Sequence, residues 1–266
     1  MIFELIYKST KIIKKGLCVF ILIFLNTGIM AQELNSQDSI KETKNGNITF
    51  KYKQLILPSI LVGYGIIGME NKSLKDLNLE IKEEVTENID RKISVDDFSQ
   101  YAPALAVYGL NLGGIKGKNN LRDRSIIFAT SYLIMGSTVY ALKKTTHVLR
   151  PDGSSYNSFP SGHTATAFAG AEFLWQEYKD VSIWYGISGY IVATGTGFFR
   201  IYNNRHWLTD VTMGAGIGIL STKIAYWMFP FVNNKIFKSN KNETSAMVAP
   251  FYNGRQMGLG MVLNVN

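Results

Sequence analysis

The sequence is poor in cysteine and in charge. A single cysteine, Cys18, among 266 residues excludes a disulfide-stapled scaffold and a cysteine-based zinc site. Charged residues make up 18% of the chain, below the roughly 25% typical of soluble domains, whereas apolar residues reach 46%. This balance excludes an intrinsically disordered chain, and 24 scattered glycines with only 6 prolines exclude collagen. What remains is a folded chain that is long enough for one large core or two domains.

The first 31 residues have the pattern of an export signal. Several lysines precede an apolar stretch, Leu17–Met30, and Ala31 offers a small residue for cleavage. We therefore predict that residues 1–31 are a signal peptide or an uncleaved anchor. The net charge of +8 could indicate binding to nucleic acid, but a protein that is exported or inserted into the membrane does not meet nucleic acid. We therefore expect no nucleic-acid partner.

Residues 32–96 predict three successive features before the main core. A polar linker comes first, and a short apolar segment follows at Leu55–Gly68. Because this segment is short and contains Pro58, we expect that it does not cross the membrane. Apolar residues at helical spacing between 70 and 98 predict a surface amphipathic helix, whose charges would form a solvated face.

Apolar helical stretches with short polar connections fill residues 97–232, and no repeat of 20–50 residues is visible. The expected fold class is therefore all-α, a membrane-embedded bundle of about six core helices. Residues 233–266 would form a C-terminal tail with a short extended segment. The stretches are Tyr101–Gly114, Ser125–Leu142, Thr164–Tyr178, Ile183–Phe199 and Val211–Val232.

Loop charges favour a membrane protein of the cell envelope. Basic residues crowd two loops, and by the positive-inside rule both loops would be cytoplasmic. The loops at 143–163 and 200–210 would then face the periplasm from the inner membrane. A soluble periplasmic protein is the alternative, since several helices are at the lower limit for spanning a bilayer. The basic residues are Lys116, Lys118, Arg122, Arg124, Lys235, Lys238 and Lys241.

Residues that could bind an anion gather between 143 and 210. Lys143 and Arg150 would suit a phosphate, the lysine as a point charge and the arginine as a bidentate fork. Ser161 and Gly162 would place a hydroxyl and backbone N–H groups at the start of a helix, which is a favourable anion site. Arg200 adds a third cation if the helix hairpin between the motifs returns the chain to the same face.

Two histidines in this region could divide acid–base and nucleophilic work. His206 and Asp210 are four residues apart, so that a carboxylate could hold one imidazole nitrogen and leave the other free. His163 lies at the start of the preceding helix. One imidazole would then act as nucleophile and the other as acid or base.

These residues form three blocks that resemble the type 2 phosphatidic acid phosphatase and vanadium haloperoxidase superfamily. The pattern of that family is K-x6-RP, PSGH and SR-x5-H-x3-D, and the matching segments here are KKTTHVLRP, PSGH and FRIYNNRHWLTD. The three blocks together are highly specific, whereas one alone would be weak. The family's serine before the third-block arginine is Phe199 here, which removes one phosphate contact.

The resemblance implies a metal-independent phosphatase that needs no cofactor. His206 would form a phosphohistidine, Asp210 would orient it, and His163 would act as the acid and then the base. The phosphate ligands would be Lys143, Arg150, Ser161, Gly162 and Arg200. The substrate would be a phosphomonoester or pyrophosphate, preferably of a lipid: phosphatidate-like, undecaprenyl pyrophosphate or lipid A.

Other readings stay open from the sequence. A soluble non-specific acid phosphatase, a vanadium haloperoxidase and a non-catalytic membrane protein share the same fold family. Lys143 and Arg150 could be interfacial charges at a helix end. Asp210 could serve only as a helix cap, and His147 is most simply a packed or capping residue.

Overall fold

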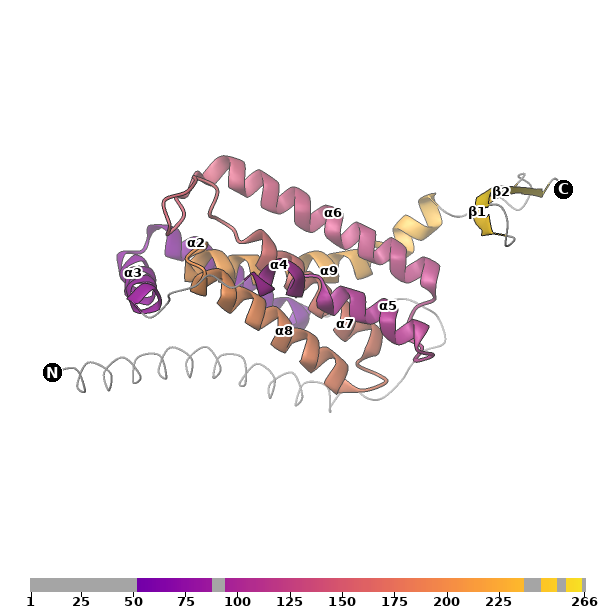
Figure 1. The fold of residues 1–266 in the computed structure, drawn as a ribbon, viewed down its shortest axis with the longest axis horizontal. Helices are drawn as coiled ribbons and strands as arrows, with labels where there is room; N and C mark the ends of the chain where they lie inside the picture. Colours follow the sequence, from indigo (N-terminus) through magenta and orange to yellow (C-terminus); the bar gives the residue numbers. More distant parts are fainter. Residues whose placement is uncertain (1–51, 88–93, 237–244, 253–256, 265–266) are drawn as a thin grey trace. The chain divides into compact units, whose positions relative to one another are not determined.

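The structure, a computed structural model, describes residues 52–87, 94–236, 245–252 and 257–264 (Figure 1). Contacts divide the chain into two units, Met1–Trp227 and Met228–Asn266. The helices are α2 (Ile56–Glu70), preceded by a 3-10 turn (Tyr52–Leu55), α3 (Lys72–Glu87), α4 (Val95–Ser99), α5 (Ala102–Leu112), α6 (Leu121–Thr146), α7 (Gly162–Tyr178), α8 (Ile183–Tyr202) and α9 (Leu208–Ile236). In the second unit, β1 (Ser245–Tyr252) and β2 (Met257–Asn264) pair antiparallel as a hairpin.

The expected all-α class of the core is confirmed. The sequence predicts about six core helices, and the five stretches located for them correspond to α5–α9. The main difference is in helix ends, which sequence patterns locate poorly. α6 starts four residues earlier than predicted because Asn120 caps it, accepting a hydrogen bond from the Asp123 amide at 2.9 Å. It stops at His147, whose left-handed φ of 48° ends the helix.

Helix α7 is the centre of the bundle. Twelve of its 17 residues are buried. Several of them are small residues, alanine and glycine, and Phe168 and Phe173 are buried among them. An apolar helix that is covered on all sides needs no polar face, which is why its composition shows no amphipathic pattern. Small residues let neighbouring helices approach its backbone closely: Gly218 of α9 lies where a Cβ would be 2.7 Å from the amide nitrogen of Ala169.

We therefore expect Gly218→Ala to destabilise the protein, by about 1–3 kcal/mol as is usual for overpacking. The added methyl group would collide with backbone atoms of α7, which cannot rotate away. The matched control is Gly136→Ala in α6, where a Cβ would meet nothing within 4 Å. That change should be neutral or slightly stabilising, because alanine favours the helix. Thermal unfolding in detergent compares the two, and equal melting temperatures would refute the packing argument.

The helices alternate in direction, so that four helix ends meet at one end of the bundle. α6 and α8 finish there, and α7 and α9 begin there. α2 runs antiparallel to α9, because Gly68 faces Thr209 whereas Gly216 faces Pro58. The C-terminal end of α2 therefore lies at the same end as the start of α9.

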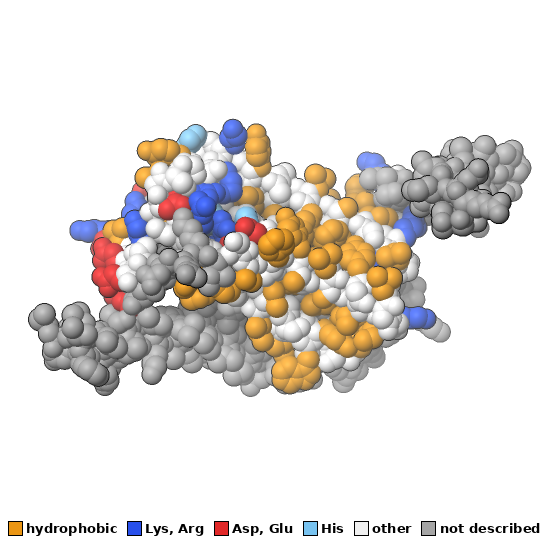
Figure 2. All heavy atoms as spheres, in the orientation of Figure 1, with side chains coloured by type: hydrophobic (Ala, Val, Ile, Leu, Met, Phe, Trp, Pro, Cys, Tyr) orange, Lys and Arg blue, Asp and Glu red, His pale blue; other side chains and the backbone are white. Residues whose placement is uncertain are grey.

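Three helical segments are long and apolar enough to cross a membrane: Tyr52–Glu70, Leu121–Thr146 and Leu208–Lys235. In the first two only 22% of the most apolar window is buried inside the protein. Exposed apolar side chains cover much of the visible surface in Figure 2, whereas acidic and His side chains gather toward one end and Lys and Arg side chains lie at both ends. Ile60, Leu105 and Leu133 are each more than 60% exposed. These features indicate a membrane protein.

Two details of residues 55–98 differ from the expectation. The apolar segment is not short, since Tyr52–Glu70 spans 19 residues. Pro58 does not interrupt it because it falls in the first turn of α2, where no intrahelical N–H bond is needed. The expected amphipathic helix is present as α3, but it covers only Lys72–Glu87, and Val95–Ser99 form the separate helix α4. In α4, Asp96 is 1% exposed, so it does not belong to a solvated face.

Candidate active site

The residues singled out from the sequence come together at the end of the bundle where α6 and α8 finish. Lys143 lies in the last turn of α6, Ser161 caps α7, and Arg200 lies near the end of α8. His206 lies in the turn before α9. The backbone joins two of these segments, because the Ser161 amide donates to the Asp210 carbonyl at 3.0 Å. Residues more than 60 positions apart thus share one site.

His206 and Asp210 form a buried pair. Their side chains are 2% and 1% exposed, and His206 Nδ1 lies 3.4 Å from Asp210 Oδ2. That oxygen also accepts from the Trp207 amide at 2.9 Å and from the Ser158 hydroxyl. Asp210 Oδ1 is buried without a hydrogen-bond partner among the described residues. The carboxylate can therefore hold Nδ1–H and leave Nε2 of His206 unprotonated.

Burial lowers the pKa of His206 to about 4, although the hydrogen bond and charge of Asp210 act to raise it. Arg200 and Lys143 lower it further. The imidazole is therefore neutral at physiological pH, which is the form that can act as a nucleophile.

Three cations surround this pair. Lys143 Nζ lies 3.4 Å from the carbonyl oxygen of Ser158, and Arg150 Nε donates to Asn157 Oδ1 at 2.9 Å. Burial, Arg200 and Arg205 together lower the pKa of Arg150, as expected for a crowded basic site. Arg200 is only 8% exposed, and its Nε makes no hydrogen bond within the described part of the chain. Such a buried, unused donor is suited to an anionic oxygen.

The start of α7 adds neutral donors. Ser161 is fully buried, and its Oγ accepts from the Thr164 hydroxyl at 2.9 Å. Gly162 is the first helical residue, and the amides of a first turn have no intrahelical acceptor. Positive partial charge at this helix end favours an anion.

His163 lies on the same first turn and has a carboxylate partner. Its Nε2 is 2.9 Å from Asp97 Oδ1, and its side chain is 30% exposed. Burial and the charge of Arg200 lower the pKa of His163, while Asp97 and Asp96 act to raise it.

Sequence reasoning missed several residues of this site. Ser158, Asp96 and Asp97 make contacts with the predicted residues, yet no spacing rule marks them. The one usable signal was the Asp96–Asp97 pair directly before an apolar helix.

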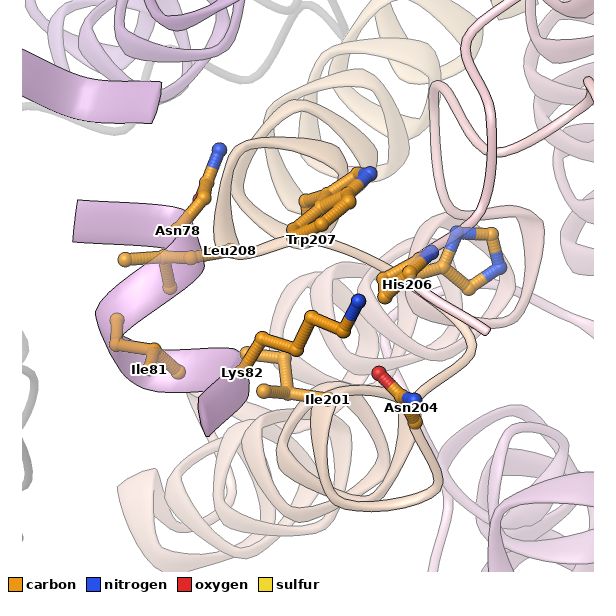
Figure 3. Close-up of a pocket in the computed structure, with 9 residues that line it drawn as sticks. Asn78, Ile81, Lys82, Ile201, Asn204, His206, Trp207 and Leu208 are labelled. Atoms are coloured by element: carbon orange, nitrogen blue, oxygen red, sulfur yellow. The ribbon is translucent and has the colours of Figure 1, made fainter. Parts of the chain in front are cut away.

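A small pocket borders His206 on the side of α3 (Figure 3). Lys82 extends from α3 toward Trp207, its Nζ 5.6 Å from the centre of the indole ring. Asn78 Nδ2 donates to Thr209 Oγ1 at 3.1 Å and ties α3 to the start of α9. The pocket is lined by Asn78, Ile81, Lys82, Pro151, Ile201, Asn204, His206, Trp207 and Leu208. α3 thus forms one wall of this pocket.

The alternative readings can be compared with these positions. Asp210 is the third residue of α9 and accepts from the Trp207 amide, so it caps the helix and contacts His206 at once. Phe199 packs against Phe198 and Tyr202, and it brings no hydroxyl group to the site. His147 is exposed at the C-terminal end of α6, as the capping interpretation predicts.

The sequence is similar to one protein family and to proteins of known function. The PAP2 superfamily model matches residues 124–234. The lipid A 1-phosphatase of Porphyromonas gingivalis is 34% identical over 222 residues, which are 76% of this chain and 50% of that protein. The chain thus spans half the length of that relative.

Two solved structures are similar at lower identity. One is LpxE of Aquifex aeolicus, with a TM-score of 0.44 and 23% identity over 56% of this chain and 94% of that one. The other is a transmembrane PAP2-type phosphatidylglycerolphosphate phosphatase of Bacillus subtilis, with a TM-score of 0.41 and 20% identity over 69% of this chain and 99% of that one.

Proposed function

Because the chain belongs to the PAP2 superfamily, we propose that it is a membrane phosphatase that removes phosphate from a lipid through a phosphohistidine on His206. The observation that carries the proposal is the buried His206–Asp210 pair within a cluster of three cations. A neutral imidazole with one nitrogen held by a carboxylate is a competent nucleophile, and the cations match a phosphoryl dianion.

The first step is in-line attack of His206 Nε2 on phosphorus. A phosphorus–nitrogen bond forms as the bond to the lipid oxygen breaks, and His163 donates its proton to that oxygen. Lys143, Arg150, Arg200, the Ser161 hydroxyl and the Gly162 amide hold the phosphoryl oxygens as charge builds up on them. In the second step His163 takes a proton from water, which attacks the phosphohistidine and releases inorganic phosphate.

A phosphate group of lipid A is the substrate that we favour among phosphorylated lipids. The similarity to a lipid A 1-phosphatase supports it. Apolar side chains exposed on α2, α5 and α6 would keep the site at the membrane surface, where a lipid phosphate is presented. Undecaprenyl pyrophosphate and phosphatidate-like lipids carry the same chemical group and are the closest competitors.

Phosphate release by the purified protein in detergent tests the proposal. The panel contains bis-phosphorylated lipid A, undecaprenyl pyrophosphate, phosphatidate and nitrophenyl phosphate, each with chelator present. We expect release from a lipid in chelator and the highest kcat/KM for lipid A. Release from nitrophenyl phosphate alone would overturn the lipid preference, and no release from any substrate would overturn the function.

The proposal includes a location: an inner-membrane protein whose site faces the periplasm. The loop that contains Ser154 lies at the site end, whereas Gly117 lies beside Glu177 at the other end of α7. A reporter that is active only in the periplasm should therefore be active when fused after Ser154 and inactive when inserted after Gly117. Activity at both positions would instead indicate a soluble periplasmic enzyme, and activity at Gly117 alone would invert the orientation.

A further inference from the structure

The short helix α4 brings two adjacent aspartates to the site. Asp96 is 1% exposed, and it accepts from Arg200 Nη1 at 2.5 Å and from Asn203 Nδ2 at 2.9 Å. One turn later, the hydroxyls of Ser99 and Thr196 lie 2.7 Å apart. α4 is therefore fastened to α8 through both of its ends, and its position relative to the site is fixed.

This anchoring holds the next side chain against His163. Asp97 Oδ1 lies 2.9 Å from His163 Nε2 and 3.7 Å from Arg200 Nη1, although the aspartate side chain is 55% exposed. A half-exposed carboxylate would normally be solvated and mobile. Here the buried contacts of Asp96 place it at hydrogen-bond distance from the imidazole.

The contact leaves one nitrogen of His163 for chemistry. Within the described part of the chain, His163 makes no other side-chain hydrogen bond, so Nδ1 is available. We propose that Asp97 is a positioning residue for the general acid: its carboxylate holds Nε2–H of His163, and Nδ1 is the nitrogen that gives its proton to the leaving oxygen. His206 is the mirror case, because Asp210 holds its Nδ1 and leaves Nε2 for attack.

The negative charge of Asp97 also affects the protonation of His163. The groups that act on His163 are Asp96 and Asp97 from α4 and Arg200 from α8. Burial and Arg200 favour the neutral imidazole, which cannot donate a proton, and the aspartates oppose them. Asp97 thus helps to keep the acid protonated beside a cationic phosphate pocket. This inference rests on the proposed function, since it assumes that His163 is the acid.

Kinetics of Asp97→Asn test the inference. We expect kcat for a lipid phosphate to fall about 10–100-fold, which is part of the rate enhancement that general acid catalysis provides. The loss of kcat for nitrophenyl phosphate should be much smaller. The loss is smaller for nitrophenyl phosphate because nitrophenolate leaves without taking up a proton. The basic limb of the pH profile of kcat/KM should move to lower pH by about one unit, since loss of a nearby negative charge lowers the pKa of His163.

Two further variants control the experiment. Asp97→Glu keeps the carboxylate and should restore most of the activity and the pH profile. Asp180→Asn makes the same chemical change at an exposed aspartate beyond the far end of α7, and it should behave as the wild type. An Asp97→Asn enzyme with equal losses on both substrates and an unmoved pH profile would overturn the inference. Tighter binding of vanadate with undiminished kcat would also overturn it, because Asp97 would then compete with the phosphoryl group.

Nitrogen NMR of protein labelled at its three histidines gives a readout that does not need turnover. Neutral His163 should carry its proton on Nε2 in the wild type, and its pKa should fall in Asp97→Asn. The same tautomer and pKa in both proteins would refute the inference. Inactivity of the wild type on every substrate, with the NMR result as expected, would instead refute the proposed function alone.

Discussion

Replacing His206 by asparagine should slow phosphate release from every substrate by at least about 10⁴-fold, the order of loss that follows removal of an enzymic nucleophile. No covalent intermediate can form without Nε2 of that imidazole. The loss should therefore not depend on the leaving group, and rapid quench with labelled substrate should trap no phosphoenzyme. The remaining cations should still bind vanadate, because Lys143, Arg150 and Arg200 are intact.

The matched control is His147→Asn. His147 is exposed at the end of α6 with φ of 48°, a conformation that asparagine tolerates. This variant should keep wild-type turnover and phosphoenzyme formation. A His206→Asn protein that still accumulates labelled phosphoenzyme would show that another residue is the nucleophile.

Replacing His163 by asparagine should have a different signature. Loss of the acid should slow cleavage of a lipid phosphate by about 10²–10⁴-fold. Nitrophenyl phosphate should still phosphorylate His206, because its leaving group departs without a proton. Hydrolysis of the phosphohistidine should then lag, because the imidazole of His163, which would activate water, is missing. Labelled enzyme should therefore accumulate.

Mapping the label on His163→Asn protein decides the assignment. The label should be acid-labile and should lie on the peptide that contains His206. A label on any other residue would contradict the assignment. A phosphoenzyme that turns over at the wild-type rate would contradict the role of His163 in the second step.

The fold was predictable where one physical signal dominates. Long apolar stretches separated by short polar loops left little choice but a helical bundle, and α7 and α8 begin within two residues of their predicted starts. The prediction failed for α2 and α4. Pro58 suggested a break, but its effect depends on its position within the helix, which composition does not reveal. The charges near residue 96 were assigned to solvent, but Asp96 is buried. Its burial comes from contact with α8, more than 100 residues away in the sequence, which a local pattern cannot reveal.

The candidate site was predictable only for side chains with a recognisable spacing. His206 and Asp210 are four apart, and the structure places them in contact. Ser158 and Asp97 reach the same site through a loop and a short helix whose paths no local pattern specifies. Motif spacing thus identified His206, its partner Asp210 and the candidate phosphate ligands, but not Ser158 and Asp97, which contact Asp210 and His163.

The direction of α2 limits how the chain can be inserted. Tyr52 lies at the end of the bundle opposite Thr209, because α2 and α9 are antiparallel. If Tyr52–Glu70 crosses the bilayer and the site is periplasmic, the chain must enter α2 from the cytoplasm. Cleavage after Ala31 by an export peptidase would leave the new N-terminus in the periplasm, on the wrong side. If Tyr52–Glu70 crosses the bilayer, a periplasmic site is therefore incompatible with cleavage after Ala31.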